Sequence, residues 1–334
     1  MTGRLQPPLV IEVDRGGLVE SRHLAHVAVV HAERGLVLSA GDAGHRSFVR
    51  SAIKMFQALP LVARGAADRW GLADEEIALA TASHGGEPFH VAAAQSVLAR
   101  CGAREDQLAC GPTAPMHAPS AEALRQAGVA PGRIHNNCSG KHAGMLALAA
   151  AEGWPTDGYH LPGHPVQAGI RDTLAEWTGV PADTFGEAVD GCGIPTFTLP
   201  LADMAAGCAR LSAAAADGVP APARVLGAMT RHPDYVAGTG RLCTDLMRAA
   251  GGRLWAKVGA EGYYCAGVPS ERLGIAIKVE DGAWRAVEPA LLATLDAIGV
   301  LDDAARRALA AYAAPTLVNT RGETVGGLRA RWPR

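Results

Sequence analysis

The chain has 334 residues, of which 49% are hydrophobic and 19% charged, and its formal net charge is -2. This balance excludes an intrinsically disordered chain, and it gives no global basic field of the kind expected for a nucleic-acid-binding or membrane-surface protein. The length suffices for one large domain or two lobes around a sizeable core.

Strand-like runs open the chain at Leu9–Val13, His26–His31 and Gly35–Ser39, and helical periodicity begins at about Phe48. Ile77–Ser83 is a short buried segment that ends in a glycine turn. Helical patterns then dominate, at Val91–Arg100, Ala121–Gln126, Lys141–Glu152, Val166–Trp177, Pro200–Ala215 and Val236–Ala249. Strands return at Arg253–Val258, Gly262–Ala266, Arg272–Val279 and Trp284–Val287, before a helix pair at Pro289–Ile298 and Asp302–Tyr312.

Strands at both ends with helices between them predict an α+β fold, in which the terminal segments share one antiparallel sheet around an inserted helical lobe. We expect residues 1–334 to form a single catalytic domain. The sheet lobe is predicted from about 8–48 and 253–330, and the helical lobe from about 49–252.

The seven cysteines are odd in number, are widely spread and form no Cys-x-x-Cys pair. A secreted disulfide framework is therefore not expected. The N-terminus contains no signal-peptide pattern, and the apolar stretch Ala143–Ala151 is far shorter than the ~20 residues of a membrane span. These features predict a soluble, cytoplasmic protein with neither a membrane nor a nucleic-acid partner.

Lysine is rare, because 27 of the 31 basic residues are arginine and only four are lysine. An amine can act as a base or a metal ligand after losing its proton, whereas a guanidinium keeps its proton near neutral pH. Codon bias toward arginine could leave four lysines by chance. The alternative is that some of them, Lys54, Lys141, Lys257 and Lys278, need an amine.

Ser51 and Lys54 form an S-x-x-K pair at the start of the first long helical pattern. A spacing of three places both side chains on one helix face, where a desolvated lysine could take the proton of the serine hydroxyl. The motif also occurs by chance in many proteins. Ser83 precedes Gly85-Gly86 and is either a substrate contact and proton shuttle or the N-cap of the helix beginning near Pro88.

Cys138 lies in the polar run Asn137-Cys-Ser-Gly-Lys-His142, which opens a strongly apolar helix. It could be a nucleophile beside His142, a metal ligand or a buried free thiol. Cys192 lies between two glycines that permit close backbone approach, and a thiolate pair with a nearby nitrogen would suit Zn²⁺. The two cysteines do not have a recognised zinc spacing.

Lys257-Val-Gly on a late strand is similar to the K-T-G element that accompanies S-x-x-K in penicillin-recognising enzymes, with Val258 in place of the threonine. Together the motifs resemble those of the rhizobial-type L-asparaginases, the asparaginase II family, from about Leu9 to Leu328. The resemblance is carried by Arg46–Lys54, Ala82–Glu87, Asn137–His142, His164–Gln167, Asp190–Pro195, Gly238–Leu246, Lys257–Gly262 and Arg321–Gly326.

This resemblance implies a fold like that of serine β-lactamases and class A glutaminases, a homodimer, and hydrolysis of L-asparagine to L-aspartate and ammonia. It implies that Ser51 is the nucleophile with Lys54 as its base, and that Ser83 pairs with Lys257. It also implies one zinc ion per chain, held next to the substrate. The ligands would be Cys138, Lys141 and Cys192, and the residues that orient the substrate would be Arg50, His142 and Asp190. Cys243 matches a family cysteine near the site whose role is open.

Other functions remain open at this point. The substrate could be glutamine, a β-substituted asparagine or an asparaginyl peptide. An S-x-x-K esterase or β-lactam-reactive enzyme is a further alternative, which the absent S-D-N element and the missing K-T-G threonine disfavour. A zinc-dependent binding module without catalysis is the third. Two serine–lysine pairs are present, so the roles of Ser51 and Ser83 could be exchanged.

Overall fold

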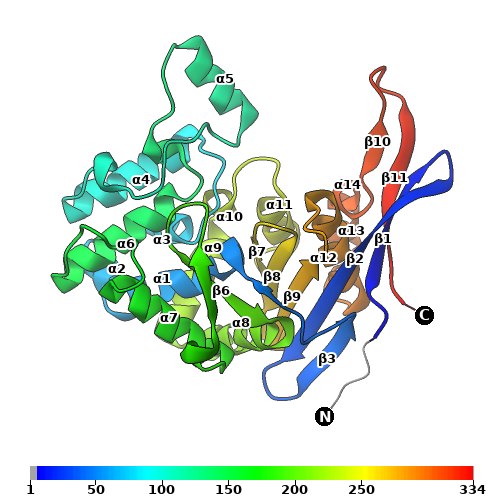
Figure 1. Ribbon diagram of the computed structural model, residues 1–334, viewed down its shortest axis with the longest axis horizontal. Helices are drawn as coiled ribbons and strands as arrows, with labels where there is room; N and C mark the ends of the chain where they lie inside the picture. Colours follow the sequence, from blue (N-terminus) through cyan, green and yellow to red (C-terminus); the bar gives the residue numbers. More distant parts are fainter. Residues whose placement is uncertain (1–5, 334) are drawn as a thin grey trace. The chain divides into compact units, whose positions relative to one another are not determined.

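The computed structural model describes residues 6–333, which form two compact units. The sheet unit contains the described residues up to Ala52 together with Thr198–Ala213 and the chain from Asp245 onward. The helical unit contains Ile53–Phe197 and Ala214–Thr244. Each unit is described by itself below, with the labels of Figure 1.

The sheet unit is built on one antiparallel sheet of order β10-β11-β1-β2-β9-β8-β7, with β3 paired to β2. The first and last strands of the chain are neighbours in this sheet, because β1 pairs on one side with β2 and on the other with β11 (Figure 1). The strands are β1 Leu9–Arg15, β2 Leu18–His31, β3 Gly35–Ala40, β7 Trp255–Val258, β8 Tyr263–Val268, β9 Leu273–Val279, β10 Thr316–Val318 and β11 Thr324–Arg331. Short β4, Arg46–Phe48, pairs instead with the end of β6, Pro195–Pro200.

Helices pack on this sheet, and its strands β8 and β9 are buried along their whole length. The helix α8, Leu201–Ala216, touches β9 at Gly274, where an added Cβ would lie 2.1 Å from the backbone nitrogen of Ala209. Only glycine permits that approach. Other helices of this unit are α12 Trp284–Ala297, which packs on the sheet, α13 Asp303–Ala308 and α14 Ala310–Ala313; α11, Leu242–Ala249, begins in the helical unit and ends in this one.

The helical unit is organised around α6, Ser139–Glu152, whose residues 139–149 are all buried. Helices α1, α3, α4 and α7 all pack against it. The approach of α3 depends on Gly140, where a Cβ would lie 2.6 Å from the carbonyl oxygen of Leu79. The helices are α1 Lys54–Ala63, α2 Ala66–Arg69, α3 Asp74–Ala80, α4 Pro88–Cys101, α5 Ala118–Gln126, α6, α7 Pro165–Thr178, α9 Pro220–Arg231 and α10 Pro233–Val236, with strand β5 at Gly186–Val189.

The α+β class is confirmed, with an antiparallel sheet assembled from the terminal segments and a helical insertion between them. Ile77–Ser83 is buried as expected, and its first four residues belong to helix α3. Two local expectations are wrong. Trp284–Val287 is the first turn of α12 rather than a strand. The region after Phe48 first forms the 3-10 turn η1, Arg50–Ile53, so that the first α-helix begins at Lys54.

No helix among residues 6–333 combines the length and the apolar character required to traverse a lipid bilayer.

Candidate active site

Lys54 is the first residue of α1, and its side chain is completely buried. Its Nζ lies 2.5 Å from the carbonyl oxygen of Ala82, 3.0 Å from Ser83 Oγ and 3.1 Å from Cys138 Sγ. Burial lowers the pKa of Lys54, and the neighbouring charge of Lys141 adds to this, whereas the Cys138 thiol acts in the opposite direction. The amine is therefore placed where losing its proton is easier than in water.

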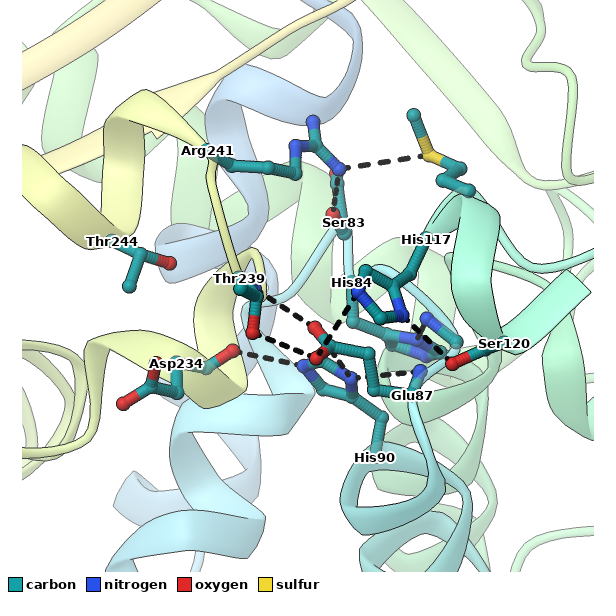
Figure 2. Close-up of polar contacts among 12 residues, drawn as sticks. Ser83, His84, Glu87, His90, His117, Ser120, Asp234, Thr239, Arg241 and Thr244 are labelled. Carbon is teal, nitrogen blue, oxygen red and sulfur yellow. Dashed lines mark hydrogen bonds and ion pairs between the residues drawn. The ribbon is translucent and has the colours of Figure 1, made fainter.

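Ser83 follows α3 in an extended loop, and backbone contacts hold it from both sides. Its amide donates a hydrogen bond to the carbonyl oxygen of Val236 at 3.0 Å, and its own carbonyl accepts one from Arg241 Nη1 at 2.9 Å (Figure 2). The side-chain cap of α4 is not Ser83, because the N-cap residue is Glu87. The N-cap alternative for Ser83 is thus excluded, and its hydroxyl instead contacts the Lys54 amine.

Glu87 ties the Ser83 loop to the turn that carries Arg241. Glu87 is 5% exposed. Its carboxylate accepts hydrogen bonds at 2.8 Å from both the amide and the hydroxyl of Thr239 (Figure 2). Burial raises the pKa of Glu87, but these two bonds outweigh it and the pKa is lowered. Gly238 has φ +105, and a Cβ there would lie 2.4 Å from Glu87 Oε1. The carboxylate therefore fixes a turn that only glycine can form.

Two histidines line the same cluster in their neutral form. His90 accepts a hydrogen bond from the Glu87 amide at Nδ1 and donates one from Nε2 to the carbonyl oxygen of Asp234. His84 accepts at Nδ1 from the Gly86 amide, so its Nε2 donates to Ser139 Oγ. Burial lowers both pKa values, for His90 to about 4. Glu87 and His90 are close but do not form a charged pair.

A second cluster contains the thiols Cys138 and Cys192 with Lys141. The Lys141 ammonium donates to Cys192 Sγ at 2.9 Å, and Asp190 Oδ2 lies 3.9 Å from the same sulfur. A hydrogen bond from the Cys138 thiol lowers the pKa of Cys192 to about 4 against the effect of burial, and the same bond with burial raises that of Cys138 to about 12. Burial lowers the pKa of Lys141, but the Cys138 and Cys192 thiols and Asp190 outweigh it and raise the pKa.

This protonation pattern argues against Cys138 as a nucleophile, because a thiol with a raised pKa supplies little thiolate. The lowered pKa of Cys192 and the hydrogen bond from the Lys141 ammonium favour the thiolate at Cys192.

The three side chains could hold a borderline-soft metal ion. They offer one thiolate, a second thiol and an amine, a donor set that suits Zn²⁺ once the thiol and the ammonium have lost their protons. Among residues 6–333 no three His, Cys, Asp or Glu side chains form a group of their own that could hold a metal. The lysine amine would therefore have to be the third ligand.

Asp190 and His142 lie in different elements of the helical unit. Asp190 follows β5 in a tight turn to β6, closed by a bond from the Gly193 amide to its carbonyl oxygen at 2.8 Å. Its Oδ1 accepts from the Gly191 amide at 2.8 Å. His142 lies one residue after Lys141 in α6 and is completely buried. Its Nδ1 contacts the hydroxyl of Tyr159.

Four further residues singled out in the sequence are described within their own elements. Arg50 and Ser51 lie in η1, and Arg50 has φ +48, a left-handed backbone conformation that is strained for a residue with a Cβ. Lys257 is buried in β7, and its Nζ donates to the carbonyl oxygen of Val258 at 2.7 Å. Cys243, in α11, is buried. The predicted pairs Ser51 with Lys54 and Ser83 with Lys257 stay predictions, whereas Lys54 with Ser83 is an observed contact.

Three functional candidates were not identified from the sequence alone. Glu87 and Arg241 lie inside motifs that the sequence resemblance covers, but nothing in their spacing indicates that they meet. Tyr159 lies in a loop of ordinary composition and has no sequence signal at all.

The family model described as L-asparaginase II matches residues 11–330. The chain belongs to the L-asparaginase II family. It is therefore an enzyme of the amidohydrolase class, an L-asparaginase-type hydrolase. No curated protein matches it.

Among solved structures, the chain is similar to a protein named Mglu, with 15% identity and a TM-score of 0.37, covering 83% of this chain and 67% of that one. It is also similar to a putative β-lactamase from Bacteroides dorei, with 14% identity and a TM-score of 0.41 over 76% and 84% of the two chains. A β-lactamase from Mycobacterium bovis has 14% identity and a TM-score of 0.32 over 81% and 94%.

Proposed function

We propose that this L-asparaginase-type enzyme hydrolyses L-asparagine to L-aspartate and ammonia through a serine that a lysine amine activates. The observation that carries the proposal is the buried Lys54 amine, 3.0 Å from a serine hydroxyl. A serine oxygen attacks an amide carbonyl only when a base takes its proton, and a desolvated amine near neutral pH can do so.

The three partners of Lys54 are compatible with a neutral amine. Such an amine has two N–H bonds and one lone pair. The carbonyl oxygen of Ala82 can only accept, and a second N–H can point to Cys138 Sγ. The lone pair then faces the Ser83 hydroxyl, which is the arrangement that proton removal requires.

The reaction balances with this one base. The serine oxygen forms an ester bond to the side-chain carbonyl carbon of asparagine while its proton passes to the amine. The C–N bond breaks as the proton moves to the departing nitrogen, which leaves as ammonia. Water then attacks the ester, gives one proton to the amine, and L-aspartate leaves as the serine recovers its hydroxyl.

We propose that Ser51 attacks, as the family resemblance implies, and that the Ser83 hydroxyl, which contacts the Lys54 amine, passes protons to and from it. The Lys54 contact also permits the exchanged roles, with Ser83 as the nucleophile. Lys257 is the second amine of the proposed machinery. Ser51→Ala and Ser83→Ala separate the roles, because an ester trapped with L-asparagine and detected by mass spectrometry is absent from the variant that lacks the nucleophile.

The zwitterionic end of asparagine needs one anionic and one cationic contact. We propose that the Asp190 carboxylate binds its α-ammonium group, that Arg50 binds its α-carboxylate, and that His142 donates a hydrogen bond to it. Asp190 is half-buried in a tight turn, so its carboxylate is held in one orientation before substrate arrives.

We propose that Cys138, Lys141 and Cys192 hold one zinc ion per chain. A zinc ion there would supply positive charge that polarises a carbonyl or holds the substrate. Without metal, the Lys141–Cys192 ion pair keeps the two donors together.

We also propose a homodimer located in the cytoplasm. The dimer rests on the family resemblance, and light scattering after size exclusion should give twice the 34.5 kDa chain mass. All seven cysteines are free thiols, which supports a reducing compartment. Fractionation of the native host would test the location.

The deciding experiment measures ammonia release from L-asparagine, L-glutamine, a β-substituted asparagine and an asparaginyl peptide, with nitrocefin as a β-lactam probe. We expect L-asparagine to have the highest kcat/KM. Lys54→Arg should lower kcat by about 10²–10⁴-fold, the usual contribution of a general base. Thermal unfolding of Lys54→Arg and of the wild type shows whether activity is lost with the base or with the fold. Full activity of Lys54→Arg, or nitrocefin turnover without ammonia release, would overturn the proposal.

A further inference from the structure

Tyr159 and His142 form a buried pair whose protons can be located from their hydrogen bonds. Tyr159 lies in the turn between α6 and α7 and is 1% exposed, and His142 is completely buried. Tyr159 Oη and His142 Nδ1 are 2.6 Å apart, with the rings edge to face at 5.7 Å. Neither group is in contact with solvent, so each proton needs a hydrogen-bond partner other than bulk water.

The phenol oxygen already accepts one hydrogen bond, from the amide of Ala109 at 2.9 Å. If His142 Nδ1 carried a proton, two N–H groups would point at this oxygen. The hydroxyl proton would then have no acceptor among the residues that the structure describes. A buried donor without a partner is disfavoured. The hydroxyl therefore donates to Nδ1, and the single proton of the neutral imidazole resides on Nε2.

That Nε2–H has no hydrogen-bond partner within residues 6–333, although it is fully buried. Because Nδ1 accepts the Tyr159 hydroxyl proton, the ring is a neutral donor through Nε2. The amines and thiols that influence it electrostatically are Lys141, Cys138 and Lys54, which are the residues of the candidate site. An oriented donor with no partner, in such surroundings, indicates a ligand atom that accepts.

Two segments besides the one that carries His142 hold Tyr159 in this orientation. The Ala109 amide binds the hydroxyl, and Gln167 of α7 donates from Nε2 to the backbone carbonyl of Tyr159 at 2.9 Å. Gln167 is itself buried. The backbone and the hydroxyl of Tyr159 are therefore both held, and the acceptor for the hydroxyl proton is the imidazole Nδ1.

We propose that Tyr159 is a positioning residue that holds His142 in its Nε2–H form, so that this N–H donates to a carboxylate or carbonyl oxygen of the amino-acid amide substrate. The role rests on the proposed function, because an amide amino acid is the acceptor. Tyr159 itself does not touch substrate. Its hydroxyl donates a hydrogen bond to Nδ1, so the imidazole proton resides on Nε2.

The test is ¹⁵N NMR of the full-length enzyme labelled at histidine, with His142→Gln to assign the His142 signals. The wild-type spectrum should show a protonated Nε2 and an unprotonated Nδ1, and addition of L-aspartate should shift Nε2. Tyr159→Phe should mix the two tautomers and raise KM about tenfold with a smaller change in kcat, the expected cost of one lost hydrogen bond. Tyr312→Phe is the matched control, because it loses a hydroxyl bonded to Asp245 and should change neither readout.

A protonated Nδ1 in the wild type would overturn the proposal, and so would Tyr159→Phe with the wild-type tautomer and KM. The wild-type spectrum decides the tautomer even when Tyr159→Phe does not fold. Failure of the proposed function has a different signature: the wild type then releases no ammonia from any amide, while the tautomer is still read from the spectrum.

Discussion

Buried His90 should make the enzyme less stable in mild acid. The ring is completely buried, stacked at 4.9 Å on His84, and both its nitrogens are occupied by backbone groups. Burial lowers its pKa from 6.5 to about 4, and the bond to the Asp234 carbonyl and the Glu87 charge offset this only in part. Since the unfolded chain binds a proton at higher pH than the folded one, stability must fall as pH decreases through this window.

The size of the effect follows from the two pKa values. A difference between 6.5 and about 4 corresponds to roughly 3 kcal/mol once both states are protonated. At pH 7.5 almost none of this is lost, whereas at pH 5 the loss is about 2 kcal/mol. The free energy of unfolding is therefore highest above the unfolded pKa of His90, and it decreases as pH falls toward the folded pKa.

Urea unfolding of the full chain at pH 7.5 and pH 5 measures this difference. His90→Gln keeps a side chain that can hydrogen-bond but removes the titration, so the pH-dependent loss should shrink by about 2 kcal/mol relative to wild type. His232→Gln is the control, because the side chain of His232 is 28% exposed rather than buried. If His90→Gln shows the same loss between the two pH values as wild type, the reasoning about His90 is refuted.

Further predictions concern the site and its scaffold. Glu87→Gln should lower kcat/KM about tenfold, because one of the two Thr239 hydrogen bonds that hold the turn before Arg241 is lost. Steady-state kinetics test this, with Glu122→Gln, which changes an exposed carboxylate, as the control. Gly140→Ala should destabilise by roughly 1–3 kcal/mol, since its Cβ meets Leu79 at 2.4 Å, while Gly169→Ala, with nothing within 4 Å, should gain up to about 1 kcal/mol in thermal or urea unfolding. Cys192→Ser should lose zinc in metal analysis after dialysis, whereas Cys101→Ser should retain about one ion per chain; equal zinc in both contradicts the proposed ligands.

Secondary structure and site motifs are predicted best from the sequence where a residue pattern is compatible with only one structure or role. Alternating burial in β1 and the buried run of β9 were identifiable because period-two patterns and β-branched runs have one simple explanation. The motif Asn137–His142 was identifiable because a polar run before an apolar helix is costly unless it has a function. Its members do lie together in the helical unit, with Cys138 against the amine of Lys54.

Other elements could not be predicted because the deciding contact is distant in sequence. Trp284–Val287 is only four residues long, and the helical repeat to which it belongs becomes visible only in Val287, Leu291 and Leu295, which α12 buries together. Pro289 suggests a helix start and instead lies inside α12. Glu87 and Thr239 are 152 residues apart, and no local pattern joins them.

The four lysines share a property that their motifs did not reveal: all are buried, between 0% and 8% exposed. Lys278, the one without an expected role, donates to the carbonyl oxygen of Glu261 at 2.7 Å and to that of Val279. Glu261 has φ +56, so this amine supports the strained turn that follows Lys257 and Val258. An ammonium donates three hydrogen bonds from one point, whereas a guanidinium needs more room in a plane. Codon bias can replace lysine by arginine wherever the side chain reaches solvent. Arginine cannot replace a lysine whose amine is buried among protein atoms. The lysines that remain in an arginine-rich chain therefore mark buried amines, and the catalytic amines are among these.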